Sequence, residues 1–179
     1  EVEYYHKRKL VPFGEYTPWY DSIIKLSSSL NIPLSNLSNG TNAQEDIFFK
    51  NTKLLPLICF ESTFPSLLKS NVENEIIINI SNDGWFGKSL APYQHLQITQ
   101  IRALEFNRYI LRAANTGLSA VIDNNGKVIK YIPINKEGVI TGFVPINLDT
   151  SFYSRYGDIF ILMLLFLTLL SQGLSRLRT

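Results

Sequence analysis

The stretch PLICFEST, residues 56–63, places the only cysteine of the chain beside a carboxylate. Cys59 ends an apolar run typical of a buried strand, and Glu61 comes two positions later. A cysteine nucleophile needs partial exposure and a base that takes its proton, and the end of a strand offers such a place. A lone cysteine in an apolar run is, however, most often a small core residue, so the residues alone leave both interpretations open.

Two further stretches carry polar residues that acyl chemistry would need. YHKRKLVPFGEY holds Lys7 and Glu15 on either side of a Pro/Gly turn, and ISNDGWFGKS follows a second apolar run. Attack of a thiolate on an acyl carbon creates an oxyanion, which a lysine or a preorganised backbone N–H stabilises. Neither His6 nor His95 is an obvious base for the thiol. Taken singly, these lysine and glutamate residues are also typical of solvated surface and loops.

Composition and missing motifs exclude several classes of protein. The chain has 179 residues, 45% hydrophobic and 18% charged, with a formal net charge of +2, which suits one domain with a core. No basic run is interleaved with aromatic residues, so nucleic acid is not an expected partner. One cysteine excludes an internal disulfide and a cysteine-rich zinc site. No G-x-S-x-G, Walker or H-E-x-x-H motif occurs, and we expect neither a metal nor a cofactor.

The elements expected around these stretches alternate between strands and helices. Continuous apolar runs predict buried strands over 54–60 and 75–81, and apolar spacing predicts a helix within 91–110. Asn125-Gly126 is a strong hairpin signal within 118–132. Other predicted elements are a strand running into a loop over 3–13, strands over 109–115 and 138–146, and a short helix over 17–30. This alternation indicates a layered α/β fold with mixed sheets.

The final segment is strongly apolar. Thr168 is the only polar residue in 159–170, and the apolar span reaches about 19 residues, which as a helix matches a hydrocarbon core of ~30 Å. A core helix would show a polar face, and 159–167 shows none, which favours a transmembrane helix over 158–177. Arg176 and Arg178 at its end would place the C-terminus in the cytoplasm and the preceding domain across the membrane.

Several motifs in order resemble the apolipoprotein N-acyltransferase family, which is part of the nitrilase (carbon–nitrogen hydrolase) superfamily. They are YHKRKLVPFGEYTP, LICFES, NISNDGWFG, QHLQITQIRALEFNRYILRAANTG and AVIDNNGKV. The resemblance covers nearly the whole chain and favours this family over soluble amidases. It implies that residues 1–150 form a partial catalytic domain, the second half of a nitrilase-type α-β-β-α sandwich, followed by the transmembrane helix over 158–177.

The superfamily uses a Glu–Lys–Cys triad, and its motifs match positions of this chain. The resemblance implies Cys59 as the nucleophile, Lys7 as the triad lysine, and Glu15 and Glu61 as further acidic residues of the catalytic site. Phe60 departs from the tyrosine often found beside the nucleophile, but its backbone N–H would still serve an oxyanion hole.

The triad glutamate has no counterpart in the chain. It is expected upstream of residue 1, and the sequence opens without an initiator methionine or a signal peptide. We therefore expect a C-terminal fragment of a longer enzyme, inactive by itself. Trp85 lies in a motif that the family places near the active site. Trp19 and Ile23 are candidates, by helical spacing, for an interfacial patch that admits acyl chains.

The resemblance implies acyl transfer from a phospholipid, the acyl donor, through a Cys59 thioester to the N-terminal diacylglyceryl-cysteine of an apolipoprotein acceptor. The expected location is the bacterial inner membrane, with the catalytic domain on the periplasmic face. Two alternatives remain open. One is a soluble amidase of the same superfamily, whose thioester water would resolve, and the other is an inactive remnant.

Overall fold

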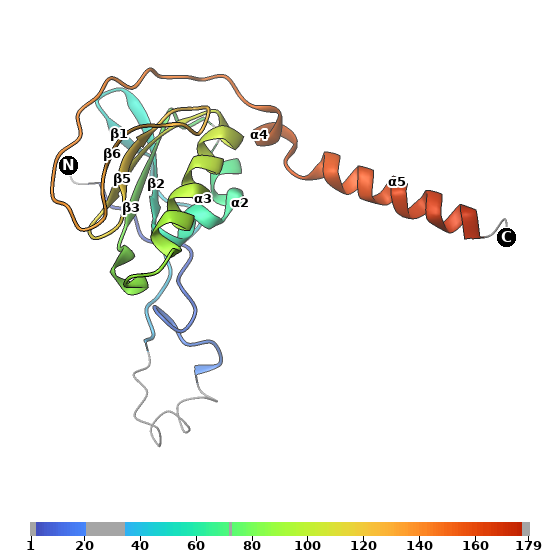
Figure 1. The fold of residues 1–179 in the computed structure, drawn as a ribbon, viewed down its shortest axis with the longest axis horizontal. Coiled ribbons are helices and arrows are strands. Elements are labelled where there is room, and N and C mark those ends of the chain that lie inside the picture. Colours follow the sequence, from blue (N-terminus) through green and yellow to red (C-terminus); the bar gives the residue numbers. More distant parts are fainter. Residues whose placement is uncertain (1–2, 21–34, 72, 177–179) are drawn as a thin grey trace.

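The computed structural model describes residues 3–20, 35–71 and 73–176. At its centre is a six-stranded sheet whose strands are neighbours in chain order (Figure 1). The strands are β1 (Ile47–Phe49), β2 (Thr52–Ile58), β3 (Ile76–Ser81), β4 (Tyr109–Ala114), β5 (Ser119–Ile122) and β6 (Val128–Ile132). β2, β3 and β4 run parallel, and the remaining pairs are antiparallel. The expected mixed α/β fold is confirmed.

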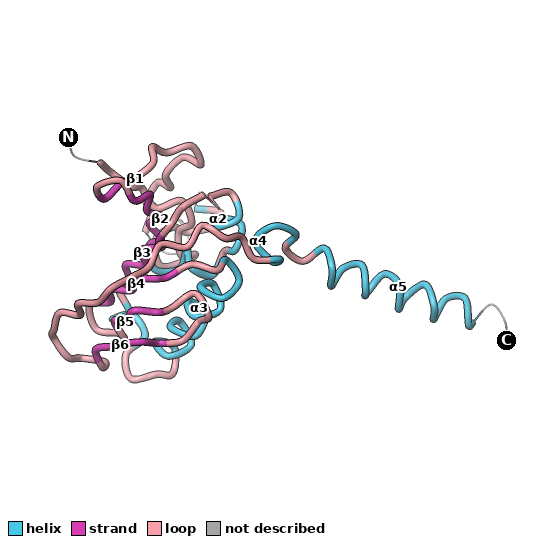
Figure 2. Tube along the Cα trace, turned by 90° about the horizontal axis from the view of Figure 1, so that it is seen from above, coloured by secondary structure: helices cyan, strands magenta, loops and turns pink. Residues whose placement is uncertain are grey.

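Two helical crossovers connect the three parallel strands, because parallel neighbours cannot be joined by a tight turn. β2 leads into the short helices η1 (Cys59–Thr63) and α2 (Pro65–Lys69), and β3 leads into η2 (Asp83–Phe86) and α3 (Ala91–Phe106). α2 and α3 lie on the same side of the sheet (Figure 2). Ile58 pairs with Ile80, so the polar turns that follow β2 and β3 begin at the same end of the sheet, the carboxyl end of its parallel strands.

The core fills the space between this sheet and its helices. Side chains alternate between the two faces of a strand, and those facing the helices are buried. They include Leu55, Leu57, Ile77, Ile110, Ala120 and Ile122, which pack with Leu67, Leu68, Leu96, Ala103 and Phe106. On the opposite face, Ile58 and Ile78 are half-buried and Ile80 is exposed. One sheet covered by helices on one face corresponds to half of an α-β-β-α sandwich.

The strongest sequence patterns are confirmed. Strands occupy the apolar runs within 54–60, 75–81 and 109–115, and α3 lies within the predicted helix. α3 ends at Phe106 because Asn107 adopts the left-handed conformation, with a φ of 54°. β5 and β6 form the predicted antiparallel hairpin, in which Gly126 has a φ of 77°.

Two predicted strands are wrong. Residues 3–13 form a loop with only an isolated bridge from Pro12 to Tyr16, and 138–146 contains no strand. Val139 and Phe143 in the second segment are 89% and 90% exposed. A strand needs a partner that satisfies its backbone groups, and among the described residues neither segment forms a ladder with another strand. The predicted helix over 17–30 falls mainly outside the described residues, and Trp19, with a φ of 53°, does not begin a helix.

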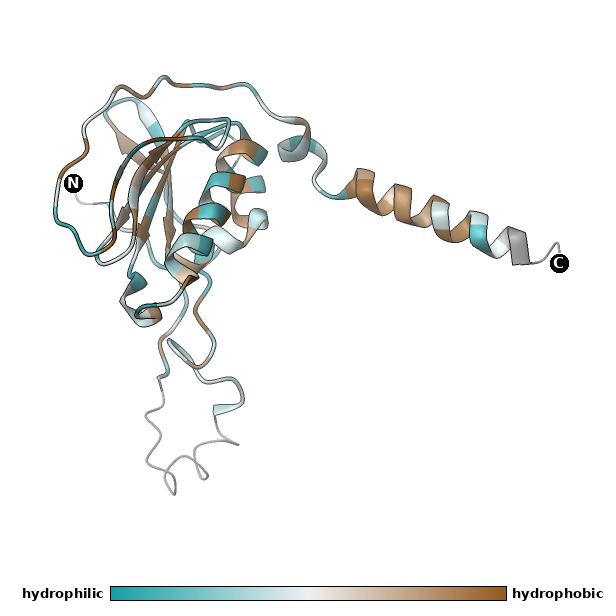
Figure 3. Cartoon of the chain, viewed as in Figure 1, coloured by the Kyte–Doolittle hydropathy of each residue, from teal (hydrophilic) through white to brown (hydrophobic). Residues whose placement is uncertain are grey.

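The C-terminal segment is helical, as expected. After α4 (Phe152–Tyr156), the helix α5 (Ile159–Arg176) projects away from the sheet and is apolar around its whole circumference over most of its length (Figure 3). Its side chains from 159 to 173 are exposed. In the part of the chain that the structure describes, no helix combines the length and apolarity needed to cross a membrane. Within the predicted segment 158–177, residues Ile159–Arg176 are therefore shown as a helix, but not as a membrane span.

Candidate active site

Cys59 lies where β2 ends and η1 begins, at the carboxyl end of the parallel strands. Its φ is 50°, a left-handed conformation that costs a residue with a side chain about 1–2 kcal/mol. The side chain is half-buried. Strained backbone of this kind clusters at functional sites, where the surrounding structure holds it in place. The cysteine is therefore not a plain core residue but a partly exposed thiol on a sharp turn.

Glu61 is fully buried and binds four donors around this turn. Its Oε1 accepts hydrogen bonds from the backbone N–H groups of Arg8, at 2.6 Å, and Lys9, at 3.2 Å. Its Oε2 accepts from the N–H of Ile58, at 2.7 Å, and from the hydroxyl of Tyr5, at 2.9 Å. Burial and the negative charge of Glu61 raise the pKa of Tyr5 above its usual range. One carboxylate thus joins residues 5–9 to the turn that carries Cys59.

Lys7 forms a half-buried ion pair with Glu15. Its Nζ lies 2.6 and 2.7 Å from the two carboxylate oxygens, and the two side chains are 11% and 26% exposed. Oε2 of Glu15 also accepts from the backbone N–H of Val11, at 2.7 Å. The turn over 11–16 therefore fixes the carboxylate, and the carboxylate fixes the lysine. Because Glu61 binds the residues that follow Lys7 and the residue that precedes Cys59, the two segments lie side by side.

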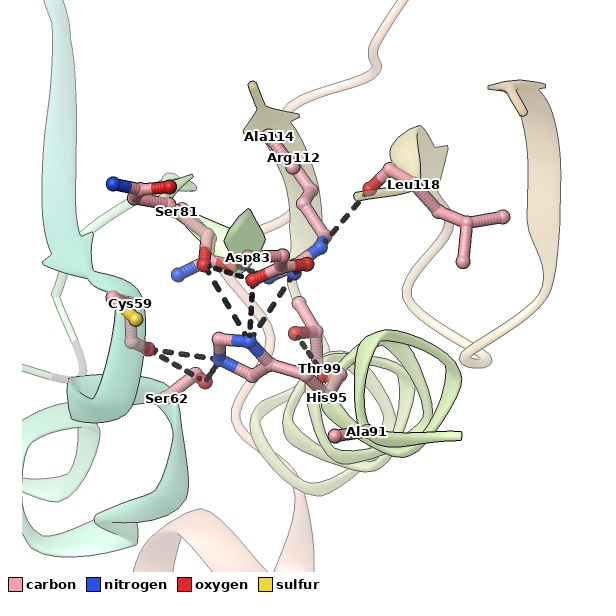
Figure 4. Close-up of polar contacts among 12 residues, drawn as sticks. Cys59, Ser62, Ser81, Asp83, Ala91, His95, Thr99, Arg112, Ala114 and Leu118 are labelled. Atoms are coloured by element: carbon pink, nitrogen blue, oxygen red, sulfur yellow. Dashed lines mark hydrogen bonds and ion pairs between the residues drawn. The ribbon is translucent and has the colours of Figure 1, made fainter. Parts of the chain in front are cut away.

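A buried histidine lies beneath Cys59 (Figure 4). Nε2 of His95, on α3, is 3.0 Å from the backbone oxygen of Cys59 and 3.0 Å from Oγ of Ser62. The Ser62 hydroxyl also donates to the Cys59 oxygen, at 3.1 Å. Nδ1 of His95 is 3.0 Å from Oδ1 of Asp83. The carbonyl of Cys59 is thus held by two side chains from the interior.

Asp83 connects this histidine to the sheet. Its carboxylate pairs with Nη2 of Arg112 at 2.7 Å, and both side chains have no exposed surface. Nη1 of Arg112 bonds to the amide oxygen of Asn79, whose nitrogen donates to the carbonyl of Leu57, at 3.1 Å. Burial alone would raise the pKa of Asp83, but hydrogen bonds from His95 and Ser81 and the charge of Arg112 lower it to about 2. Burial lowers the pKa of Arg112.

The geometry of Cys59, Asp83 and His95 also raises the question of a metal. One ligand atom from each lies within 4.8 Å of the others. However, Nη2 of Arg112 is 3.3 Å from Nδ1 of His95 and already neutralises Asp83. A metal cation at this point would meet a guanidinium cation, so the three residues are better described as a hydrogen-bonded support than as a ligand set.

An open groove of about 500 Å³ adjoins the turn that carries Cys59. Phe60, the neighbour of Cys59, lines it together with Phe64, Leu10 and Lys9. The rings of Phe60 and Phe64 meet edge to face at 5.1 Å, and Nζ of Lys9 lies 5.6 Å from the Phe64 ring centre. The groove therefore offers apolar surface with a cation at its side.

The other residues expected at the site lie on the surface or outside the described chain. Trp85, on η2, is 76% exposed, and Trp19 is 77% exposed. Ile23 falls outside the described residues. The structure thus brings together the Cys59 turn, the Lys7–Glu15 pair and Glu61. The side chains of the two tryptophans are exposed to solvent.

Comparison with known proteins shows the family to which the chain belongs. The family model for carbon-nitrogen hydrolases matches residues 2–151. The chain belongs to the carbon–nitrogen hydrolase family. Within this family, the chain is 38% identical to an apolipoprotein N-acyltransferase of Pasteurella multocida, over 97% of the chain and 34% of that relative. It is 40% identical to an apolipoprotein N-acyltransferase of Rickettsia bellii, over 90% of the chain and 32% of that relative.

The curated relatives are longer than this carbon–nitrogen hydrolase sequence, which spans about a third of their length. Among solved structures, a carbon-nitrogen hydrolase from Helicobacter pylori G27 superposes with a TM-score of 0.51 at 15% sequence identity. The match covers 56% of this chain and 43% of that chain. It supports the nitrilase-like fold alone.

Proposed function

We propose that this chain carries the nucleophile of an apolipoprotein N-acyltransferase, which moves an acyl chain from a membrane phospholipid to a lipoprotein amine. The observation that carries the proposal is the placement of Cys59 on a strained, half-exposed turn that Glu61 joins to the Lys7 segment. The similarity to N-acyltransferases over nearly the whole chain selects this branch of the family.

In the first step, the thiolate of Cys59 attacks the carbonyl carbon of a phospholipid acyl ester. The sulfur–carbon bond forms, a tetrahedral oxyanion results, and the carbon–oxygen ester bond breaks to release a lysophospholipid. We assign the Lys7 ammonium and the N–H of Phe60 to the oxyanion, since a cation and a fixed N–H donor stabilise it best. A glutamate upstream of residue 1 would take the thiol proton and return it to the leaving alkoxide.

In the second step, the α-amino group of a diacylglyceryl-cysteine attacks the thioester. The carbon–nitrogen bond forms, the amine loses a proton to the same base, and Cys59 leaves as a thiolate. Water would compete with the amine and convert the enzyme into a hydrolase. The apolar groove beside Phe60 supports amine transfer, because an acyl chain lying in it would exclude water from the thioester.

The same function places the protein at the bacterial inner membrane, with this domain on the periplasmic face. The exposed apolar side chains of α5 support this location, since large apolar patches on soluble proteins are rare. We assign segment 158–177 to the membrane, and Arg176 and Arg178 at its end to the cytoplasmic side. Trp19, Ile23 and Trp85 would contact lipid or its acyl chains, because tryptophan favours the membrane interface.

Mass spectrometry of the complete protein tests the proposal. After incubation with vesicles of phosphatidylethanolamine and phosphatidylglycerol, we expect a single acyl adduct on Cys59 that disappears in Cys59→Ala. Addition of a diacylglyceryl-cysteine peptide should discharge the adduct as an N-acyl peptide. Discharge as free fatty acid at the same rate, with or without peptide, would instead identify a hydrolase. A folded protein that never forms the adduct would refute the nucleophile assignment.

A further inference from the structure

We propose that His95 is a positioning residue. It holds the peptide bond between Cys59 and Phe60 so that the N–H of Phe60 points into the oxyanion hole. The inference rests on the proposed acyl transfer at Cys59 and adds the residue that aims the N–H of Phe60. His95 is 6% exposed, and it reaches the nucleophile only through a backbone carbonyl.

The planarity of the peptide bond provides the mechanical link. The described chain contains no cis peptide bond, and in a trans peptide the C=O and the following N–H point in opposite directions. The carbonyl of Cys59 points inward to Nε2 of His95 and to the hydroxyl of Ser62. The N–H of Phe60 must therefore point outward. As the second residue of η1, Phe60 has no acceptor for this N–H within the helix, which leaves it available to a substrate oxygen.

The contact of Nε2 with a carbonyl oxygen favours the tautomer that carries a proton on Nε2. A carbonyl oxygen only accepts, so the contact of 3.0 Å to Cys59 is favourable when Nε2 donates and repulsive when it carries a lone pair. Nδ1 lies 3.0 Å from Oδ1 of Asp83 and 3.3 Å from Nη2 of Arg112. When Nδ1 accepts from the guanidinium, the proton of the neutral ring lies on Nε2; when Nδ1 donates to the carboxylate, Nε2 carries a proton only in the imidazolium form.

Asp83 and Arg112 hold the ring in this orientation. The guanidinium bonds to Asp83, to the amide of Asn79 and, at 3.1 Å, to the carbonyl of Leu118. The guanidinium therefore spans β3, β4 and the start of the hairpin. The ring is thus positioned by the sheet, and a fixed donor costs no reorganisation when the oxyanion forms.

Two chemical reactions of the same thiol separate positioning from folding. Acylation by a phospholipid passes through an oxyanion. Alkylation by iodoacetamide does not, because the sulfur displaces iodide directly from a saturated carbon. Both rates are measured on the complete protein by intact mass, the first with phosphatidylethanolamine–phosphatidylglycerol vesicles. Loss of the oxyanion donor should lower the first rate alone.

His95→Asn and His95→Gln form a matched pair. The Asn amide nitrogen replaces Nδ1 and leaves the Cys59 carbonyl without its histidine donor, whereas the Gln amide nitrogen replaces Nε2. We expect His95→Asn to lower the acylation rate about 100-fold, the effect of losing one oxyanion donor. The alkylation rate should stay close to that of the wild-type protein, and His95→Gln should recover most of the acylation rate.

Other outcomes overturn the inference. Equal losses of acylation and alkylation in His95→Asn would show a merely structural histidine, and wild-type values of both rates would show that the carbonyl needs no donor. If His95→Asn does not fold, Ser62→Ala removes the second donor to the same carbonyl and must lower the ratio. A wild-type protein that alkylates but never acylates would refute the proposed function, whereas normal acylation in all variants would refute this inference alone.

Discussion

The carboxylate of Glu61 lies 2.6 Å from the backbone nitrogen of Arg8, a residue 53 positions away in the chain. Through this bond and its contact with Ile58, it sets the distance between the lysine segment and the nucleophile turn. Glu61 itself is fully buried. Its expected role in the reaction is therefore positioning, and its substitution should change the reactivity of Cys59.

Glu61→Gln tests this role. All four partners of the carboxylate are donors, and an amide nitrogen turned toward Ile58 would place two donors face to face. The loss of one hydrogen bond to a charged group costs about 1.5–3 kcal/mol, so we expect the acylation rate to fall about 10- to 100-fold. Single-turnover formation of the Cys59 adduct measures it. Glu73→Gln is the control, because the Glu73 side chain is 72% exposed in a surface pair with Lys53.

The ion pair of Lys7 leads to a second prediction. If its ammonium stabilises the oxyanion, Lys7→Met should lower the acylation rate about 100- to 1,000-fold and leave phospholipid binding unchanged. Glu15→Gln should cause a smaller loss, since the lysine keeps its charge but loses the carboxylate that fixes it at 2.6 Å. Acylation rates at several vesicle concentrations separate the rate of chemistry from binding. Equal behaviour of Lys7→Met and Lys127→Met, a change at the exposed hairpin turn, would remove Lys7 from the site.

The left-handed backbone of Cys59 gives a prediction about stability. Cys59→Ala and Cys59→Gly both remove the thiol, but only glycine adopts a φ of 50° without strain. We expect the free energy of unfolding of the glycine variant to exceed that of the alanine variant by about 1 kcal/mol. Denaturant unfolding of the complete protein in detergent measures the difference. A glycine variant less stable than the alanine variant would contradict the strained turn.

The sequence allowed prediction of the elements whose patterns are local. Ile76 to Ile80 form a strand because an apolar, β-branched run suits a sheet centre, and Gly126 allows the hairpin turn. The segment over 3–13 was predicted wrongly for a different reason. Its backbone donors bind the side chain of Glu61, a long-range partner that no local pattern specifies.

The residues beneath the nucleophile were missed for the same reason. From the sequence, the only role to weigh for His95 is that of a base for the thiol. In the structure, His95 binds the Cys59 carbonyl, 36 positions away. The sequence of β3 nevertheless contains a pattern that indicates a buried polar network. Asn79 and Ser81 alternate with Ile78 and Ile80, which places them on the same face as buried Ile77. Polar residues on a core face must find partners there, and this condition points to a buried network without naming its members.

The carboxylate of Asp83 should make stability depend on pH. Its pKa is about 2 in the folded protein, below the ordinary value of 3.8, so folding favours the ionised form. The stabilisation is therefore complete above about pH 4 and is lost as the pH falls through 2, and its size is about 2 kcal/mol. Asp83→Asn should be less stable than the wild-type protein at pH 7, with a gap that narrows on acidification.

The free energies of unfolding of Asp83→Asn and of the wild-type protein, measured at intervals between pH 7 and pH 2, check this difference. Asp46→Asn is the control, because Asp46 pairs with Lys53 at the surface, and exposed pairs contribute little. Its curve should run parallel to that of the wild-type protein. Asp83 also faces Arg112, which remains charged throughout this range and therefore adds nothing to the change with pH. A constant gap between Asp83→Asn and wild type down to pH 2 would show that the folded protein does not hold this carboxylate in its ionised form.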